Sequence, residues 1–308
     1  MLVEEAHGQV RAIADITIVT NSNARAVDSG VRENIAAAFR EHGVTPTIIV
    51  AAGDRIEDAA RRAVQVGSSM VVAAGGDGTV NAVASAVAGT ASILGVIPLG
   101  TLNHFAKDLG IPLDVPSAVA TVVNGLATTI DAGEVNGRLF LNNASVGLYP
   151  RLVWERTREQ RRGRRKSFAF LLALARVWRR YRRVTVSVHD DSRERLIHTP
   201  FVFVGNNEYR LEGVRIGGRT RLDRGDLHLC MAPGLRRVDV IRISLAAIVG
   251  RLHTIDRFES VRTKQLSIAA RRKRLGVSLD GELTVLYTPL HFRIRPAALR
   301  VTVPQEGL

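Results

Sequence analysis

The sequence predicts an α/β plus all-β protein: a Rossmann-like parallel α/β domain over residues 1–130 and an antiparallel β-sandwich domain over residues 131–294. The chain has 308 residues, more than one hydrophobic core usually serves. Its first part alternates short β-branched runs with amphipathic helical patterns, which is typical of a parallel sheet covered by helices. The later part carries strand-like runs without regular helices between them, which favours antiparallel sheets. We expect the last segment, residues 295–308, to join the first domain.

Four strands and the helices between them are expected in the first domain. The strands are predicted at residues 16–20, 47–50, 70–74 and 93–97. A first helix is expected to start at Asp28 and Ser29, because short polar residues cap helices, and to bury Val31, Ile35, Ala38 and Phe39. A second helix is expected to be capped by Asp54, to bury Ile56, Ala60 and Ala63 or Val64, and to end at Gly67. Residues 80–87 are expected to continue as a third helix.

The second domain is expected to contain seven strands and one long insertion. The strands are predicted at residues 138–142, 184–188, 200–204, 226–231, 265–269, 276–279 and 290–294. Between the first two lies a helical, very basic segment from Arg151 to Arg183.

Composition and charge limit the functions that the chain can have. With 46% hydrophobic and 23% charged residues, the chain is expected to fold throughout. Its net charge of +14 predicts an anionic partner, such as a nucleotide, a nucleic acid or lipid headgroups. Cys230 is the single cysteine, so no disulfide within the chain is expected and the cytoplasm is the expected compartment. No secretory signal is expected in the first ten residues, and no apolar stretch reaches the roughly 20 residues of a membrane span.

The first motif with chemical content is GGDGT, from Gly75 to Thr79. A buried strand delivers its glycines to the head of a helix, where backbone N–H groups and the helix dipole can face a phosphate. Asp77 and Thr79 add a carboxylate and a hydroxyl at the same point. A strand-to-helix turn that merely requires glycine would give the same pattern, so a second motif is needed.

That second motif follows one strand later. The expected strand 93–97 ends near Gly100 and Thr101 and leads to a second helical segment with Asn103 at its start. Because parallel strands present their carboxyl ends at one edge, where open α/β sheets bind ligands, the two loops are expected to converge on phosphate. No lysine follows the glycines and GxGxxG is absent, so neither a P-loop nor an ordinary dinucleotide site is indicated.

The pair GGDGTVNAV (75–83) and PLGTLNHFAKDLGIP (98–112) resembles the diacylglycerol kinase catalytic-domain family, in particular its bacterial soluble lipid-kinase branch, which is related to NAD kinases and sphingosine kinases. Further matching segments extend the resemblance over nearly the whole chain. They are FLNNASVGL (140–148), FVFVGNN (201–207), RLDRGDL (221–227) and LDGE (279–282). NAD kinases share the GGDGT loop, but GTLN is not their pattern.

The resemblance implies an ATP-dependent, magnesium-dependent kinase that binds ATP between its two domains and phosphorylates a lipid hydroxyl. It implies that the nucleotide is bound by Asn21, Asn23, Gly75, Gly76, Asp77, Gly78, Thr79, Gly100, Thr101 and Asn103. It also implies that Asp77 and Glu282 are catalytic, with Glu282 as the general base. A carboxylate can accept the proton of an acceptor alcohol while magnesium offsets phosphoryl charge. A solvated acid in a hairpin turn is the alternative interpretation of Glu282.

Two positions depart from the family pattern. His104 stands where relatives carry an acid after the GTxN asparagine, and Asp108, one helical turn later, is a candidate substitute as a metal ligand. Arg224 replaces the second acid of the family's paired aspartates, which leaves Asp223 and Asp226 as candidate magnesium ligands. An ordinary exposed helix acid is the alternative for Asp108.

The segment Arg151–Arg183 carries 13 basic residues against Glu155 and Glu159. Apolar residues at helical spacing between its arginine clusters suit a helix on an anionic membrane, which would make the protein peripheral. Packing of the apolar face on the protein core is the alternative.

The leading hypothesis is therefore a lipid kinase for diacylglycerol or a similar lipid. A sphingoid-base or NAD-kinase-like phosphotransferase, and a catalytically weak module that binds membrane or nucleic acid, are the competing hypotheses. Aromatic residues make up only 5% of the chain, which argues against nucleic acid as the partner. The acceptor, the effect of His104 and Arg224, and the oligomeric state are left open by the sequence.

Overall fold

The computed structural model describes residues 8–9, 15–22, 29–147, 184–190, 193–212, 215–219, 221–231, 259–270 and 272–305. The chain divides into two compact units. Unit 1 comprises Met1–Ala132 and Arg295–Leu308, and unit 2 comprises Gly133–Ile294. The basic segment Arg151–Arg183 lies outside the described residues, so the prediction of a helix there is not tested.

Unit 1 is built on a parallel sheet. Its strands are β2 (Ile16–Asn21), β3 (Thr47–Ala51), β4 (Met70–Gly75) and β5 (Ile93–Pro98), and they lie side by side in the order β5-β4-β2-β3. Val301, in the last part of β19 (Leu290–Val303), pairs in parallel with Leu94 of β5. The four predicted strands of this unit are thus confirmed.

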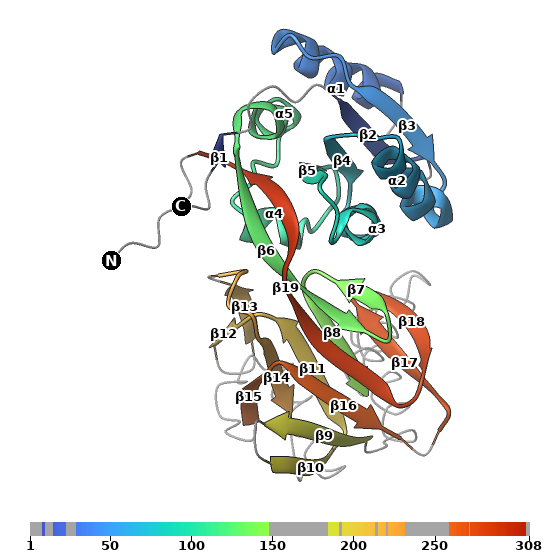
Figure 1. The fold of residues 1–308 in the computed structure, drawn as a ribbon, viewed down its shortest axis with the longest axis vertical. Helices are drawn as coiled ribbons and strands as arrows, with labels where there is room; N and C mark the ends of the chain where they lie inside the picture. Colours follow the sequence, from blue (N-terminus) through green and yellow to red (C-terminus); the bar gives the residue numbers. More distant parts are fainter. Residues whose placement is uncertain are drawn as a thin grey trace, which may run out of the picture. The chain divides into compact units, whose positions relative to one another are not determined.

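Two pairs of helices cover this sheet (Figure 1). They are α1 (Ser29–Glu41) with α5 (Val115–Asn124), and α2 (Ile56–Gln65) with α3 (Asp77–Val87). The predicted apolar faces are buried: α1 contributes Ile35 and Phe39, and α2 contributes Ile56, Ala60 and Ala63. Strand β4 is buried along its whole length, as expected of a central parallel strand.

The expected cap at Asp54 is wrong. Helical geometry begins earlier, in a 3-10 turn at Gly53–Arg55, and Arg55 is the residue before α2. Because Asp54 lies inside that turn, it lacks the extended backbone of a capping residue. Asp114 caps helix α5, because its carboxylate accepts a hydrogen bond from Ser117 N at 2.9 Å. Helix α5 was not predicted from the sequence.

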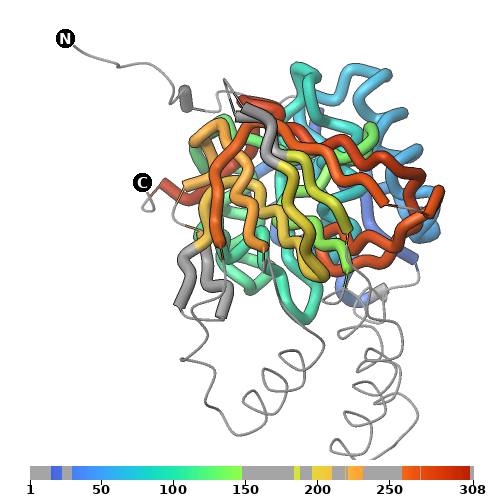
Figure 2. The backbone as a smooth tube through the Cα atoms, turned by 90° about the horizontal axis from the view of Figure 1, so that it is seen from below, coloured from blue at the N-terminus to red at the C-terminus, as the bar shows by residue number. Residues whose placement is uncertain are grey.

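Unit 2 is antiparallel. One sheet has the strand order β15-β14-β11-β8-β17-β18. A second set of strands has the order β10-β9-β16-β19, and the residues of β19 up to Ile294 belong to this unit. The bounds are β8 (Asn143–Gly147), β9 (Val184–Asp190), β10 (Arg193–Thr199), β11 (Phe201–Asn206), β14 (Leu227–Met231), β15 (Glu259–Thr263), β16 (Gln265–Ala269), β17 (Arg274–Leu279) and β18 (Glu282–Tyr287). Strands distant in sequence, such as β9 and β16, lie side by side (Figure 2).

Buried side chains from these two sets of strands pack together in one hydrophobic cluster. Phe140 and Phe292 meet edge to face with ring centroids 6.3 Å apart, which is a favourable aromatic geometry. The expected α/β plus antiparallel β architecture is therefore confirmed. The predicted strand 138–142 corresponds to β7 (Arg138–Phe140) and ends before β8. The strands that were not predicted are β1 (Gly8–Gln9), β6 (Leu126–Val135), β8, β10, β12 (Tyr209–Glu212), β13 (Arg215–Arg219), β15 and β18. Among the described residues, no helix is long and apolar enough to cross a membrane.

Candidate functional site

The carboxyl ends of four parallel strands lie at one edge of unit 1. In the register of the sheet, Asn21 lies opposite Ala51, and Gly75 lies opposite Pro98. The predicted convergence of the two glycine loops is therefore confirmed. Ligands bind at this edge in open α/β sheets.

The GGDGT loop turns directly into helix α3. Gly76 is the residue before the helix, with an extended backbone (φ −87°, ψ −177°), and it offers no side chain to cap the first turn. A Cβ atom on Gly75 would lie 2.5 Å from the Oγ1 atom of Thr79, so only glycine fits there. The first-turn N–H groups of a helix point along its axis, where the dipole favours an anion. The geometry at the start of α3 therefore favours an anion there.

The two loops are in backbone contact. Leu99 N donates to Gly75 O at 2.9 Å, and a Cβ atom on Gly100 would lie 2.6 Å from the Cα atom of Gly76. Glycine at both positions allows this approach, which brings the start of the GTLN loop against the start of α3.

Asn103 holds the second loop in shape. Its backbone is left-handed (φ 50°, ψ 47°), which asparagine tolerates better than most residues, and its side chain is buried. The side-chain Oδ1 accepts from Gly100 N at 3.0 Å and Nδ2 donates to Gly100 O at 2.8 Å. Both ends of the amide thus bind the loop itself, so Asn103 acts as a positioning residue here.

The remaining predicted nucleotide residues lie around this edge. Asp77 is half-buried at the start of α3, and its Oδ1 is 3.5 Å from Phe105 N. Thr101 is exposed, and Asn21 is half-buried near Gly53, which lies in the turn that follows β3. Asn23 lies outside the described residues.

The two positions that depart from the family pattern fall on one short helix, α4 (His104–Asp108). His104 is exposed beside Asn103, and Asp108 is half-buried at the other end of the helix. The role of Asp108 as a metal ligand stays a prediction.

In unit 2, the LDGE motif forms a two-residue hairpin between β17 and β18. Leu279 pairs with Glu282, and the turn residues Asp280 and Gly281 have φ of 47° and 88°. Positive φ at both residues is typical of the tight hairpin turn that Asp-Gly favours. Glu282 is exposed at the first position of β18.

Asp280, which the sequence analysis did not select, anchors this hairpin. Its carboxylate accepts three backbone N–H bonds, from Leu141 at 2.8 Å, Asn142 at 2.7 Å and Asn143 at 2.9 Å. Asp280 N in turn donates to Asn143 O at 2.8 Å. The Asp-Gly pair between two strand-like runs was the available signal, but it predicts a turn and not these distant partners.

The weaker family segments meet in one buried polar cluster. Arg219, 7% exposed, donates through Nη1 to Leu141 O at 2.6 Å and to Asn206 O at 3.1 Å. Its Nη2 donates to Asn142 Oδ1 at 2.7 Å. Asn207 Oδ1 accepts from the backbone of Arg224 at 2.9 Å. Segments 140–148, 201–207, 221–227 and 279–282 are thus linked by hydrogen bonds within unit 2.

The candidate metal ligands of unit 2 have other partners. Asp223 accepts two hydrogen bonds of 3.0 Å from Arg221, which hold the pKa of that carboxyl below its usual value. Arg224, in place of the family's second acid, pairs with Glu208 at 2.6 Å. Asp226 Oδ2 is 4.0 Å from Arg262 Nε, while its buried Oδ1 has no hydrogen-bond partner among the described atoms.

Within the described ranges, no three His, Cys, Asp or Glu side chains gather as a metal-ligand set. Magnesium, however, needs few protein ligands, because it is commonly bound by one or two carboxylates together with substrate phosphates. Asp77, half-buried in the first turn of α3, has a suitable donor for such a site. Asp223, engaged by Arg221, suits it less.

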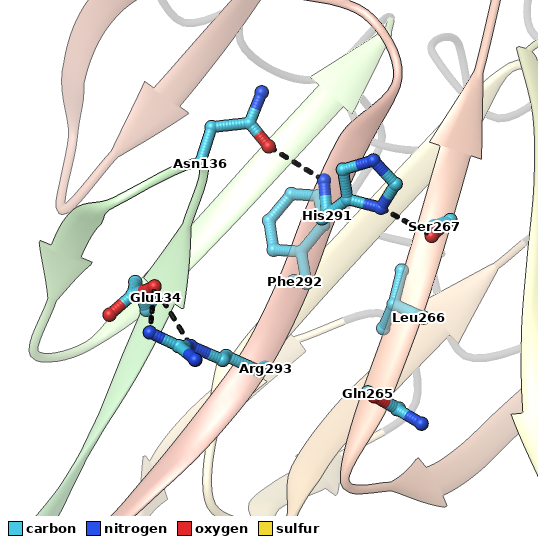
Figure 3. Close-up of a pocket in the computed structure, with 8 residues that line it drawn as sticks. All are labelled: Glu134, Asn136, Gln265, Leu266, Ser267, His291, Phe292 and Arg293. Carbon is cyan, nitrogen blue, oxygen red and sulfur yellow. Dashed lines mark hydrogen bonds and ion pairs between the residues drawn. The ribbon is translucent and has the colours of Figure 1, made fainter.

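A cavity of about 630 Å³ lies elsewhere in unit 2 (Figure 3). Its lining residues are Glu134, Asn136, Gln265, Leu266, Ser267, His291, Phe292 and Arg293. Arg293 and Glu134 form an ion pair of 2.7 Å, and Ser267 contacts His291 at 2.9 Å. None of the predicted site residues lines it.

Comparison with protein families gives two matches. Residues 15–135 match the diacylglycerol kinase catalytic domain. Residues 149–303 match the YegS C-terminal NAD kinase beta sandwich-like domain.

Two similar proteins are named as lipid kinases. The chain is 32% identical over 254 residues to a "Probable lipid kinase YegS-like" of Pseudomonas aeruginosa, which covers 79% of each protein. It is 45% identical over 107 residues to the diacylglycerol kinase of Bacillus subtilis (strain 168), but that match spans only 35% of the relative and 34% of this chain.

A solved structure has the same fold. The crystal structure of a diacylglycerol kinase from Bacillus anthracis str. Sterne superimposes with a TM-score of 0.66 at 18% identity, covering 96% of this chain and 98% of that one.

Proposed function

Because the chain belongs to the diacylglycerol kinase and YegS-like lipid kinase family, we propose that it transfers the γ-phosphoryl group of ATP to a hydroxyl of diacylglycerol or a similar lipid. The observation that carries this proposal is the contact of Gly76 with Gly100 at the head of α3. It brings two glycine loops together at a helix N-terminus, which is an arrangement suited to adjacent phosphates.

Residues of unit 1 bind the nucleotide in this proposal. The amides that start α3 receive phosphate oxygens, and Gly75, Gly76 and Gly100 let the phosphates approach the backbone. Asn103 keeps the second loop in its left-handed turn, so the amides around Gly100 are oriented before ATP arrives. Preorganised donors of this kind are the main catalytic resource in phosphoryl transfer.

Glu282 accepts the proton of the acceptor hydroxyl in this proposal. The hydroxyl oxygen forms a new bond to the γ-phosphorus, the bond from that phosphorus to the β,γ-bridging oxygen breaks, and ADP leaves. The tight turn held by Asp280 fixes the start of β18, and the exposed carboxylate of Glu282 is therefore presented on a rigid hairpin.

Magnesium, when bound with the nucleotide, would neutralise charge on the phosphates. Asp77 is the proposed ligand, since a hard carboxylate beside the phosphate loop has the chemistry that this ion requires. Asp108, Asp223 and Asp226 remain proposed ligands of lower priority, and Asn21 and Asn23 remain proposed nucleotide contacts.

The experiment that tests the function is a transfer assay with labelled ATP and magnesium. The acceptors are diacylglycerol, sphingosine, phosphatidylglycerol and NAD, each presented to the wild-type protein and to a Gly100→Ala variant. We expect label in a lipid product with the wild type and its loss in the variant. Transfer to NAD alone would indicate a kinase that acts on NAD and not on a lipid. No transfer to any acceptor would favour the alternative of a catalytically weak module that binds membrane or nucleic acid.

A further inference from the structure

The outer face of the β17–β18 hairpin is apolar where an antiparallel sheet should be polar. Side chains alternate along a strand, so one face of the hairpin enters the core and the other meets solvent. Leu286 and Val277 lie on the inner face and belong to the core. Leu283, Val285 and Tyr287 lie on the other face and are 47%, 62% and 62% exposed.

Leu283, Val285 and Tyr287, which we call the hairpin stripe, have little cover from the neighbouring strand except where Arg274 meets Tyr287. Leu283 lies opposite Ser278, and Val285 lies opposite Gly276. Both partners are too small to shield an apolar neighbour. Strand β18 is also the last strand of its sheet in the described part of the chain, so no described strand flanks the stripe on its far side.

Cationic groups gather at one end of the stripe. Arg272, Lys273 and Arg274 are all exposed. The Arg274 guanidinium lies over the ring of Tyr287, 4.8 Å from its centroid, and its Nη2 is 2.5 Å from the Tyr287 hydroxyl. An aromatic ring with a polar tip, joined to an arginine and next to aliphatic side chains, suits the boundary between lipid headgroups and acyl chains.

We propose that the hairpin stripe docks on an anionic lipid surface, with its three apolar side chains entering the membrane boundary and Arg272, Lys273 and Arg274 meeting the headgroups. This inference rests on the proposed function, since a lipid acceptor lies in such a surface. Buried apolar area and headgroup attraction together drive interfacial binding of this kind.

The stripe and the proposed base share a strand. Glu282 is the first residue of β18, and Leu283, the next residue, begins the stripe. Because side chains alternate along a strand, Glu282 lies on the opposite face of the hairpin from Leu283, so docking would bring β18 to the headgroups without turning the Glu282 side chain toward them.

A second copy of the chain could also cover the stripe, but two observations favour a lipid surface. The three adjacent cations complement anionic headgroups. In addition, the carbonyl of Tyr287 already accepts a hydrogen bond from Asn136 Nδ2 at 2.9 Å, which occupies part of the edge that strand pairing would use.

Vesicle sedimentation at low salt, without ATP, tests the docking. The vesicles are phosphatidylcholine alone or mixed with phosphatidylglycerol, and the variant is the triple L283S/V285S/Y287S. We expect the triple variant to partition at least tenfold more weakly onto the mixed vesicles and the wild type to bind pure phosphatidylcholine weakly. The matched control is V66S/L196S, which removes two side chains of 82% and 65% exposure elsewhere and should bind as the wild type does.

Further measurements separate the outcomes. Val285→Trp should bind more tightly, a gain that misfolding cannot produce. The triple variant should lose activity on vesicles but keep it on a soluble short-chain diacylglycerol. If the wild type phosphorylates no acceptor but its vesicle binding still depends on the stripe, the proposed function is refuted and the docking proposal is retained. Equal vesicle binding by wild type and triple variant would overturn the docking. The docking would also be overturned if the wild type bound no vesicles and instead formed a concentration-dependent dimer that the triple variant does not form.

Discussion

A Cβ atom on Gly100 would come within 2.6 Å of the Cα atom of Gly76, closer than non-bonded carbon atoms approach in folded proteins. The same test on Gly76 gives 3.3 Å to the Cα atom of Gly100, which a small shift can relieve. The two loops therefore depend on glycine to different degrees.

We predict that Gly100→Ala lowers the free energy of unfolding by about 1–3 kcal/mol, the usual range for an overpacked site, and weakens ATP binding at least tenfold. Gly76→Ala should have the same effects to a smaller extent. Thermal unfolding and calorimetric titration with ATP measure the two quantities. Gly53→Ala is the control, because its Cβ atom would meet only ordinary contact, at 3.6 Å from Asn21 Nδ2. Equal stability of Gly100→Ala and the wild type would contradict the predicted loop contact.

Asn103 contributes two hydrogen bonds and a left-handed backbone. Replacing it by alanine removes both bonds to Gly100, each of about 1 kcal/mol, and places a residue in a conformation that alanine disfavours. Asn103→Gly loses the same bonds but tolerates the backbone. We therefore expect the KM for ATP to rise in both variants and stability to fall further in Asn103→Ala. If both variants kept the wild-type KM, the positioning role of Asn103 would be refuted.

Asp280 and Glu282 lie two residues apart, but we expect substitution of Asp280 to lower stability and substitution of Glu282 to lower activity. Asp280→Asn replaces an acceptor of three N–H bonds by a group with one acceptor, so we expect a loss of about 3 kcal/mol in the free energy of unfolding. Glu282→Gln alters an exposed side chain and should change stability by less than about 0.5 kcal/mol.

Catalysis should distinguish the same two variants. Removal of a general base lowers kcat by about 10²–10⁴-fold, so we expect that loss in Glu282→Gln with vesicle binding unchanged. Steady-state kinetics and chemical denaturation provide both readouts. A Glu282→Gln enzyme with full kcat would assign Glu282 to the solvated surface and remove it from the mechanism.

The glycine loops could be predicted from sequence because local signals coincide with strand order. Buried runs before GGDGT and before GTLN indicate neighbouring parallel strands, and the register of Gly75 with Pro98 confirms that both loops leave the sheet at one edge. The burial of Ile56, Ala60 and Ala63 followed from their helical spacing in the same way.

Long-range polar partners could not be predicted in this way. Asp280 binds residues 137 to 139 positions earlier in the chain, and Arg219 binds Leu141 O across 78 positions. No periodicity links such positions, since the contacts depend on how the strands assemble. The same holds for the hairpin stripe: alternation in LTVLY indicates a strand, but only the assembled sheet determines which of its faces meets solvent.

His228 gives a pH prediction. The ring is 3% exposed, and burial lowers its pKa, while Glu208 and Asp226 offset part of that effect and Arg262 adds to it. Its Nδ1 accepts a hydrogen bond from Tyr209 N at 3.2 Å and must therefore stay unprotonated, and Nε2 lies 3.1 Å from Ser260 Oγ. Protonation would place two donors face to face at Tyr209.

The folded state therefore binds the His228 proton less readily than the unfolded state. Stability from this group is fully present above the ordinary histidine pKa of about 6.5 and is lost as the pH falls below it. We expect the free energy of unfolding, measured by urea denaturation, to decrease between about pH 6.5 and pH 5. Asp114 and Asp223 also have lowered pKa values, but they change the free energy of unfolding only at more acidic pH, because their ordinary pKa is 3.8.

The variant His228→Asn can keep an acceptor for Tyr209 N without a group that titrates, so its stability should vary less over that interval. Replacing the exposed His198 by glutamine is the matched control and should leave the pH dependence of the wild type. An identical slope in the His228→Asn protein and the wild type would assign the acid sensitivity to another group, since linkage requires the slope to follow the proton that His228 binds on unfolding.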